Sequence, residues 1–69
     1  MNFLSMKYFV VLAEEGSFTK AAEKLHVTQQ TLSAHVAGLE KESGAKLFIR
    51  HVPLELTDAG RVFYRLKGS

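Results

Sequence analysis

The residues from Thr28 to Leu39, TQQTLSAHVAGL, offer the side chains best suited to contact another molecule. At 100° per residue, Leu32, Val36 and Leu39 fall on one side of a helix. The opposite side starts with small and amide side chains, such as Gln30, and becomes basic only near its end. A solvated helix face usually carries Lys, Glu and Arg instead. Because amides pair with base edges and small residues allow close approach, this face suits a nucleic-acid groove.

Other kinds of site find little support. His26, His35 and His51 lack the spacing of a metal-ligand set, and Glu40 and Glu42 are interpreted as solvated helix charges. There is no glycine-rich phosphate loop. The chain has no cysteine, which excludes disulfides and is consistent with a reducing cytoplasm. We therefore expect no enzyme activity, no metal and no cofactor in this domain.

The overall composition describes one small domain. A chain of 69 residues buries only about 60% of its unfolded surface. The net charge of +2 and the pI near 9.2 permit binding to nucleic acid without requiring it. No apolar run approaches the roughly 20 residues of a membrane span, and no signal peptide is evident. These features predict a cytoplasmic protein without a membrane partner.

Two helices are predicted before the opening stretch. Asn2 is a plausible N-cap for a helix that runs to about Glu15 and ends at Gly16. Ser17 then caps a second helix over residues 18–25, whose apolar side chains repeat at i, i+3, i+4 and i+7. Both helices therefore have an apolar side to bury.

A short turn joins the second helix to the third. It spans Leu25 to Thr28 and contains His26, one of the non-glycine residues that adopt a left-handed backbone most often. Thr28 caps the third helix, which ends at Gly44. A link of three or four residues is typical of a helix-turn-helix. Gly38 costs about 1 kcal/mol inside a helix, which indicates close backbone contact with DNA or with another helix.

A small β-hairpin follows the third helix. Residues 47–49 are β-prone and residues 54–56 alternate, while Pro53 between them keeps the strands short. This pattern predicts a wing at about residues 47–56. Thr57 then caps a last helix whose apolar stripe is still running at the end of the sequence. We expect this chain to be a fragment whose last helix packs against a partner.

In this order, the features resemble the LysR-type transcriptional regulator family. The match is FVVLAEEGSFTKAAEKLHVTQQTLSAHVAGLEKESGAKLFIR, followed by LELTDAG. The resemblance implies a mostly α winged helix-turn-helix: a three-helix bundle, a hairpin wing and the start of a linker helix. Residues 1–57 would form the DNA-binding domain, with the helix-turn-helix at about 18–37, and residues 58–69 would begin the dimerisation helix. The family also has a C-terminal effector domain, absent here, for which a small-molecule co-inducer is expected.

Some positions depart from the family pattern. The family usually has proline at the position of Gln30 and often arginine at the position of Ala34. The wing usually has a further basic residue after Arg50, whereas this chain has a shorter loop, His51-Val52-Pro53. The preferred DNA sequence should therefore differ from that of a typical member.

The predicted DNA contacts come from three segments. The recognition helix, at about residues 28–43, would lie in the major groove, where glutamine pairs with adenine and alanine contacts the thymine methyl. The start of the second helix offers backbone N–H groups to phosphate, and the wing reaches adjacent backbone or the minor groove. The predicted residues are Ser17, Thr19, Lys20, Thr28, Gln29, Gln30, Thr31, Ser33, Ala34, Arg50 and His51. We expect His35 to be half-buried instead.

The first helix also carries a second apolar stripe. Either the domain wraps around this helix or the stripe meets another element or a second subunit. The predicted dimer contacts are Leu4, Tyr8, Val11, Val62, Phe63 and Leu66. The implied partners are an operator DNA and a second copy of the chain in a homodimer, or in a tetramer of the full-length protein. RNA polymerase is a further candidate partner.

Two alternatives remain at this point. One is a helical protein-interaction module without DNA affinity, which the low net charge and the two stripes on the first helix would favour. The other is a different winged-helix class, such as a MarR-like or GntR-like repressor. The Gly-Ser-Phe-Thr and Leu-Glu motifs speak against this second alternative.

Overall fold

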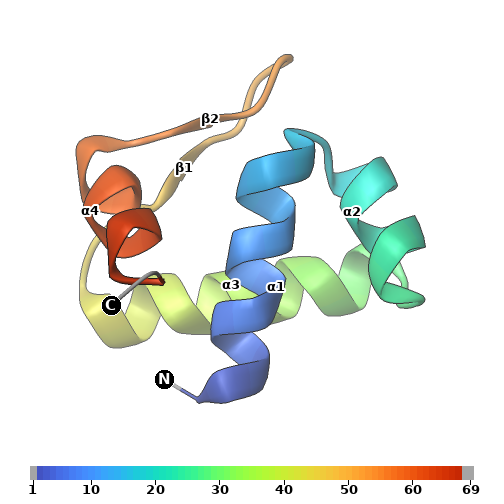
Figure 1. The fold of residues 1–69 in the computed structure, drawn as a ribbon, viewed down its shortest axis with the longest axis horizontal. Coiled ribbons are helices and arrows are strands. Elements are labelled where there is room, and N and C mark those ends of the chain that lie inside the picture. Colours follow the sequence, from blue (N-terminus) through green and yellow to red (C-terminus); the bar gives the residue numbers. More distant parts are fainter. Residues whose placement is uncertain (1, 68–69) are drawn as a thin grey trace.

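The structure is a computed structural model that describes residues 2–67. Over that range it is mostly helical, with an antiparallel hairpin between the last two helices (Figure 1). The elements are α1 (Phe3–Glu15), α2 (Phe18–Leu25), α3 (Gln29–Ser43), β1 (Phe48–Ile49), β2 (Glu55–Leu56) and α4 (Asp58–Leu66). This order confirms the predicted winged helix-turn-helix. Residues 68 and 69 of the predicted linker segment lie outside the described residues.

Local signals set the helix boundaries. Each helix begins after a polar side chain that accepts a hydrogen bond from the backbone N–H three residues further on, as expected of an N-cap. These caps are Asn2, Ser17, Thr28 and Thr57. The first three helices end at left-handed residues, with φ of 67° at Gly16, 59° at His26 and 74° at Gly44. All of these predicted boundaries are confirmed.

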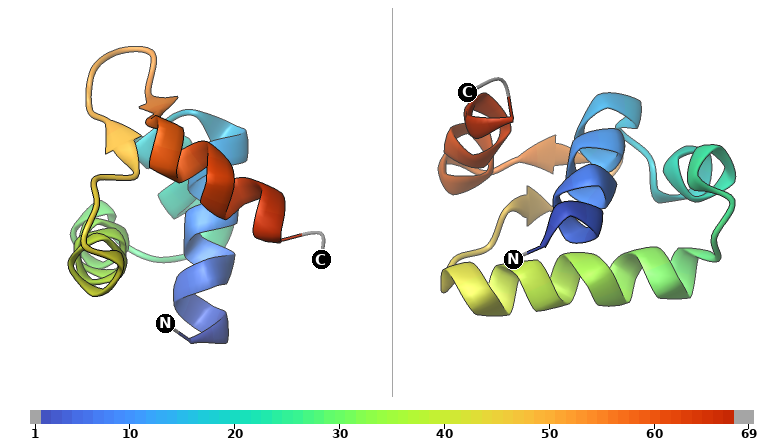
Figure 2. Two further views of the ribbon diagram at one scale, coloured as in Figure 1. Left: turned by 90° about the vertical axis from the view of Figure 1, so that its left-hand side faces the viewer. Right: turned by 60° about the horizontal axis from the view of Figure 1, so that its bottom comes forward.

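The core lies where α1, α2 and α3 meet. α1 crosses α3, and α2 packs beside both (Figure 2). Phe9, Leu12 and Leu32 are fully buried there. Tyr8, which was predicted at a subunit interface, lies in this core instead. It is only 8% exposed, and its ring centroid is 4.6 Å from that of His35, which is half-buried as expected.

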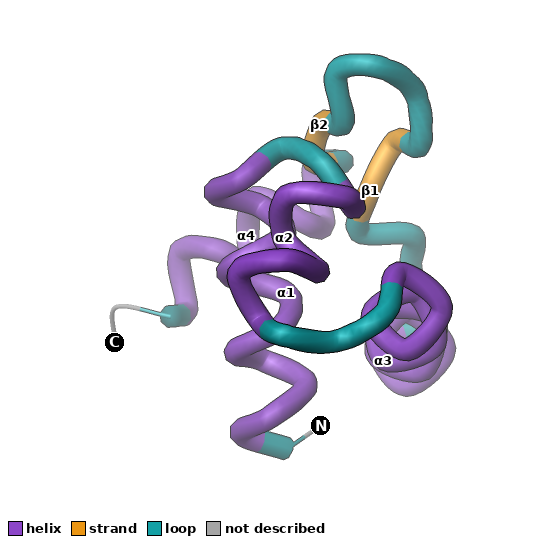
Figure 3. Tube along the Cα trace, turned by 90° about the vertical axis from the view of Figure 1, so that its right-hand side faces the viewer, coloured by secondary structure: helices purple, strands orange, loops and turns teal. Residues whose placement is uncertain are grey.

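The hairpin forms the wing. Phe48 pairs with Leu56 and Ile49 with Glu55 in antiparallel register. Phe48 is buried and its ring centroid is 5.3 Å from that of Phe9, which ties the first strand to the core. The connecting loop projects away from the helices (Figure 3). The wing is therefore anchored at its base and free at its tip.

Glu40 is a buried residue, so its interpretation as a solvated charge is wrong. Its side chain is only 7% exposed. Oε2 accepts hydrogen bonds from the backbone N–H groups of Leu47, at 2.7 Å, and Phe48, at 3.3 Å. The Lys46 ammonium lies 4.0 Å from the other carboxylate oxygen. The chain turns back after Gly44 and aims these donors at the carboxylate, an arrangement that helix periodicity alone does not reveal.

A close backbone contact joins α4 to the same segment. Thr57 Oγ1 donates a hydrogen bond of 2.6 Å to the Lys46 carbonyl. Gly60 is buried, and a Cβ built on it would lie 2.1 Å from the Leu47 carbonyl oxygen. Gly60 was not among the residues predicted from the sequence to matter. Gly38 differs: no atom of residues 2–67 outside its own helical turns lies within 4 Å of a Cβ placed there, so no other helix of this domain explains that glycine.

Candidate nucleic-acid interface

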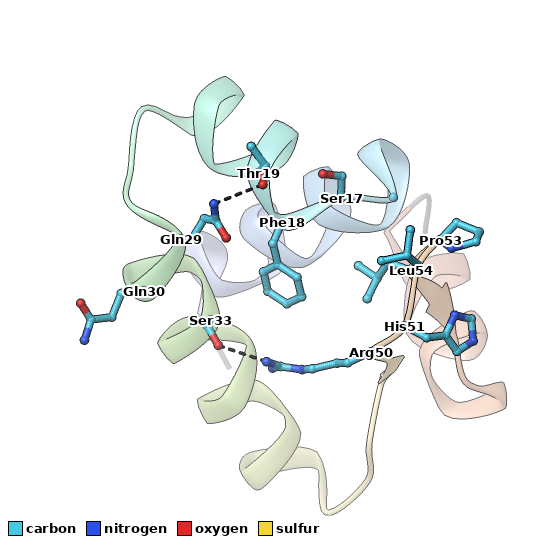
Figure 4. A pocket seen from close by; sticks show the side chains of 12 residues that line it. Ser17, Phe18, Thr19, Gln29, Gln30, Ser33, Arg50, His51, Pro53 and Leu54 are labelled. Atoms are coloured by element: carbon cyan, nitrogen blue, oxygen red, sulfur yellow. Dashed lines mark hydrogen bonds between the residues drawn. The ribbon is translucent and has the colours of Figure 1, made fainter.

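An open cleft lies between the start of α2, the start of α3 and the wing (Figure 4). Predicted contact residues from all three segments line it, although they are far apart in sequence. These residues are Ser17, Thr19, Gln29, Gln30, Ser33, Arg50 and His51. The other predicted contacts do not line the cleft but are exposed nearby. They are Lys20 on α2, the N-cap Thr28, and Thr31 and Ala34 on α3.

The outer face of α3 is exposed as its periodicity predicted. Leu32, Val36 and Leu39 are buried beneath it. Gln30 points away from the protein (Figure 4) and Ala34 is exposed one turn further on. This leaves an uncharged, solvent-facing surface on the first two turns of the helix.

Some polar groups of this surface already have partners within the protein. Thr28 Oγ1 accepts from the Thr31 backbone N–H and donates to Thr31 Oγ1, both at 3.0 Å. The Gln29 side-chain amide Nε2 donates to Thr19 Oγ1 at 3.1 Å, which joins the starts of α3 and α2 (Figure 4). These bonds limit the orientations that the side chains adopt before any ligand binds.

Arg50 crosses the cleft from the wing to α3 (Figure 4). Its Nη1 donates to Ser33 Oγ at 3.2 Å, and its Cζ lies 4.9 Å from the centroid of the Phe18 ring. A guanidinium over an aromatic face gains from the ring quadrupole. This cation therefore lies beside the polar start of α3, where it adds positive potential to the cleft.

His51, beside the wing tip, has a partner within the hairpin. His51 Nε2 lies 3.2 Å from the Glu55 carboxylate of the same hairpin. Val52, at the tip, is 99% exposed. Of the two predicted wing contacts, Arg50 faces the cleft and His51 pairs within the wing.

The predicted dimer contacts differ in how exposed they are. Leu4, Val62 and Leu66 are exposed, whereas Val11 and Phe63 are partly buried, the latter 6.0 Å from Phe9 between ring centroids. Phe3 is 85% exposed but was not among the predicted dimer contacts. Its position on the first turn of α1, at one end of the helix, is the feature of the sequence that could have indicated its exposure.

Neither a metal site nor a membrane span is found in the part of the chain that the structure describes. Among residues 2–67, no three His, Cys, Asp or Glu side chains gather in a way that would hold a metal ion. None of the helices described here combines the length and apolar character needed to cross a membrane.

The α2–turn–α3 unit with its neighbouring hairpin defines a winged helix-turn-helix protein. Residues 3–61 match the family model described as "Bacterial regulatory helix-turn-helix protein, lysR family". The chain therefore belongs to the LysR family of bacterial regulators.

Individual relatives agree with this assignment. The chain is 48% identical over 64 residues to the HTH-type transcriptional regulator CatR of Pseudomonas putida, covering 93% of this chain and 22% of CatR. It is 48% identical over 65 residues to the nitrogen assimilation regulatory protein nac of Escherichia coli K12, covering 93% of this chain and 21% of that protein. The chain thus spans about a fifth of the length of these relatives.

Solved structures share the fold. A crystal structure of the BenM DBD with catB site 1 DNA superposes with a TM-score of 0.93 at 42% identity, covering 96% of this chain and 74% of the other. A CbnR DBD–DNA complex gives a TM-score of 0.89 at 38% identity, with coverages of 94% and 76%.

Proposed function

We propose that this chain is the sequence-specific, double-stranded DNA-binding domain of a LysR-family transcriptional regulator. The observation that carries the proposal is the convergence of polar side chains from α2, α3 and the wing on one cleft beside the exposed face of α3. Two structural relatives with the same fold were solved as complexes with DNA.

The geometry supports a different DNA contact for each of the three segments, α3, α2 and the wing. An α-helix with its side chains is roughly 10–12 Å wide, which fits a major groove about 12 Å wide. The start of α3 would enter that groove and bring Gln29, Gln30 and Ser33 to base edges. Backbone N–H groups at the start of α2 would meet phosphate, while the wing lies on the adjacent backbone or minor groove.

The proposal extends to the protein of which this chain would be part. Such a regulator would act in the cytoplasm as a homodimer, or as a tetramer, and α4 would begin the linker helix. A small-molecule co-inducer would bind its C-terminal effector domain, and RNA polymerase would be a further partner. No cofactor is proposed for the chain itself, and its role is regulatory rather than enzymatic.

Selection of bound duplexes from a random DNA library tests this function. We expect one sequence class to be enriched and its affinity to fall with salt, by about 0.9 log units per phosphate contact for each log unit of salt. Gln29→Ala should weaken binding to the enriched duplex more than to random DNA, by about 1–3 kcal/mol for a bidentate contact. Ser33→Ala should show the same preference with a smaller loss, because a hydroxyl makes no bidentate pair. Ser43→Ala, at the far end of α3, is the matched control and should change neither affinity.

The same experiment distinguishes DNA binding from the alternative function, a protein-interaction module. Equal losses on enriched and random DNA would contradict base recognition by Gln29 and Ser33. Absence of any salt-dependent duplex affinity would overturn the proposal in favour of a protein-interaction module, for which the exposed Phe3, Leu4 and Val62 would be the contact surface.

A further inference from the structure

The hydrogen bond between Thr19 and Gln29 links two residues with different predicted roles. Thr19, on α2, was expected at phosphate, and Gln29, at the start of α3, was expected at a base. Both side chains are exposed, yet they meet at 3.1 Å with Gln29 as the donor. The contact spans the turn of the helix-turn-helix, so it involves the two segments that would face DNA together.

The hydrogen bond to Thr19 leaves part of the Gln29 amide available to pair with a base. A glutamine amide has two N–H donors and one carbonyl acceptor. The bond to Thr19 uses one N–H, which leaves Oε1 and the second N–H available. One donor beside one acceptor is the pair that glutamine presents to adenine N7 and N6. A glutamine without this contact would sample other side-chain rotamers, in which the amide faces other positions.

We propose that Thr19 is a specificity-determining residue that acts by positioning the Gln29 amide. Its hydroxyl holds the Gln29 side chain in one rotamer, so that Gln29 discriminates among bases more sharply than an unrestrained glutamine. Holding the side chain in advance also lowers the rotamer entropy lost on binding. This inference rests on the proposed DNA-binding function and adds to it a residue that sets sequence preference without contacting the base.

The first test uses the free chain. In wild type, the side-chain amide of Gln29 should give a high heteronuclear NOE, as expected of a restrained group. Thr19→Val, which keeps the branched shape but lacks the hydroxyl, should lower this NOE by making the amide mobile. Thr19→Ser keeps the hydroxyl and should preserve the wild-type NOE. An amide that is already as mobile in wild type as in Thr19→Val would overturn the proposal without any DNA.

The second test measures base preference on the duplex that wild type selects from a random library, with each base pair then replaced in turn. Thr19→Val should reduce discrimination at one base pair by about threefold to tenfold, as expected for one hydrogen bond, and leave the salt dependence unchanged. In a Gln29→Ala background the same substitution should have no further effect.

The outcomes are distinguishable. If wild type selects no sequence, the DNA-binding function fails and this inference fails with it. If wild type selects a sequence but Thr19→Val weakens all duplexes equally, with a smaller salt dependence and the same loss in the Gln29→Ala background, Thr19 is a phosphate contact and the positioning role is wrong. Circular dichroism of each variant verifies that the fold is kept.

Discussion

The two ends of α3 place polar side chains in opposite environments. At the start, Gln29 and Gln30 are exposed, and the amide of Gln29 donates a hydrogen bond to Thr19 on the neighbouring helix. At the end, the Glu40 carboxylate is buried and accepts two backbone N–H groups from the segment that leads into the wing. Binding needs groups whose hydrogen bonds are still available, whereas anchoring needs groups whose hydrogen bonds are satisfied. One helix therefore serves recognition at one end and architecture at the other.

The largest effect should follow from removing the anchor. Glu40→Ala leaves the buried N–H groups of Leu47 and Phe48 without their acceptor, so we expect a loss of about 3 kcal/mol in the free energy of unfolding. Glu40→Gln keeps one acceptor oxygen and should cost less, about 1 kcal/mol. Urea denaturation followed by circular dichroism measures both. Glu23→Ala, on the exposed side of α2, is the control, and an equal effect at Glu23 would contradict the anchoring role.

A pair of glycine substitutions sharpens the same comparison. Gly60→Ala places a methyl group 2.1 Å from the Leu47 carbonyl oxygen, so the backbone must shift at a cost of about 2 kcal/mol. Gly38→Ala, inside α3 with open space around it, should instead stabilise the protein by about 0.5–1 kcal/mol. Thermal unfolding should show shifts of opposite sign, and shifts of the same sign would refute the packing argument.

Arg50 tests whether the wing contributes charge or position to the recognition end. Arg50→Ala should weaken DNA binding by about 1 kcal/mol and lower the salt slope by about 0.9 if the guanidinium neutralises one phosphate. Arg50→Lys keeps the charge but loses the planar fork that reaches Ser33 and lies over Phe18, so it should retain the slope. If the salt dependence of binding is unchanged in both variants, Arg50 neutralises no phosphate and serves only its contacts within the protein.

The smallest effect concerns the contact between α4 and α1. Tyr64 Oη donates to the Glu14 carboxylate at 2.8 Å, and this hydrogen bond, followed by desolvation and the carboxylate charge, raises the pKa of Tyr64 above its ordinary value of 10.0. A raised pKa means that the contact contributes fully below pH 10 and is lost as the pH rises through the folded-state pKa. Tyrosinate absorbance should therefore appear at lower pH in Glu14→Gln, and identical titrations would contradict the contact.

The local signals of the sequence were sufficient for most of the fold. Capping at Ser17 and Thr28, the left-handed His26 and the apolar spacing of α3 depend on neighbours within a few residues, so they can be predicted from the sequence. The hairpin followed from β-prone residues on either side of Pro53. Exposure at the start of α3 was predictable for the same reason, since helical periodicity fixes which side chains face outward.

The mistakes fall where distant segments meet. Tyr8 belongs to an apolar stripe that looked available for a partner, but α3 brings His35 against its ring. In the sequence Glu40 resembles an ordinary surface charge, but the folded chain brings the Leu47 backbone N–H to it. Gly60 is crowded because the Leu47 carbonyl lies against α4. For Glu40 and Gly60, the neighbouring residues in the sequence give no sign of these contacts.

The sequence by itself determined the helices, their caps, the turn and the wing, because short-range hydrogen bonding and periodicity set them. The order of its motifs also indicated the family. Tertiary structure decided which charge is buried, which glycine is crowded and which side chains meet across the cleft. Contacts such as Thr19 with Gln29 and Arg50 with Ser33 depend on the angle between packed elements. That angle results from the packing of the whole core, so no single stretch of sequence encodes it.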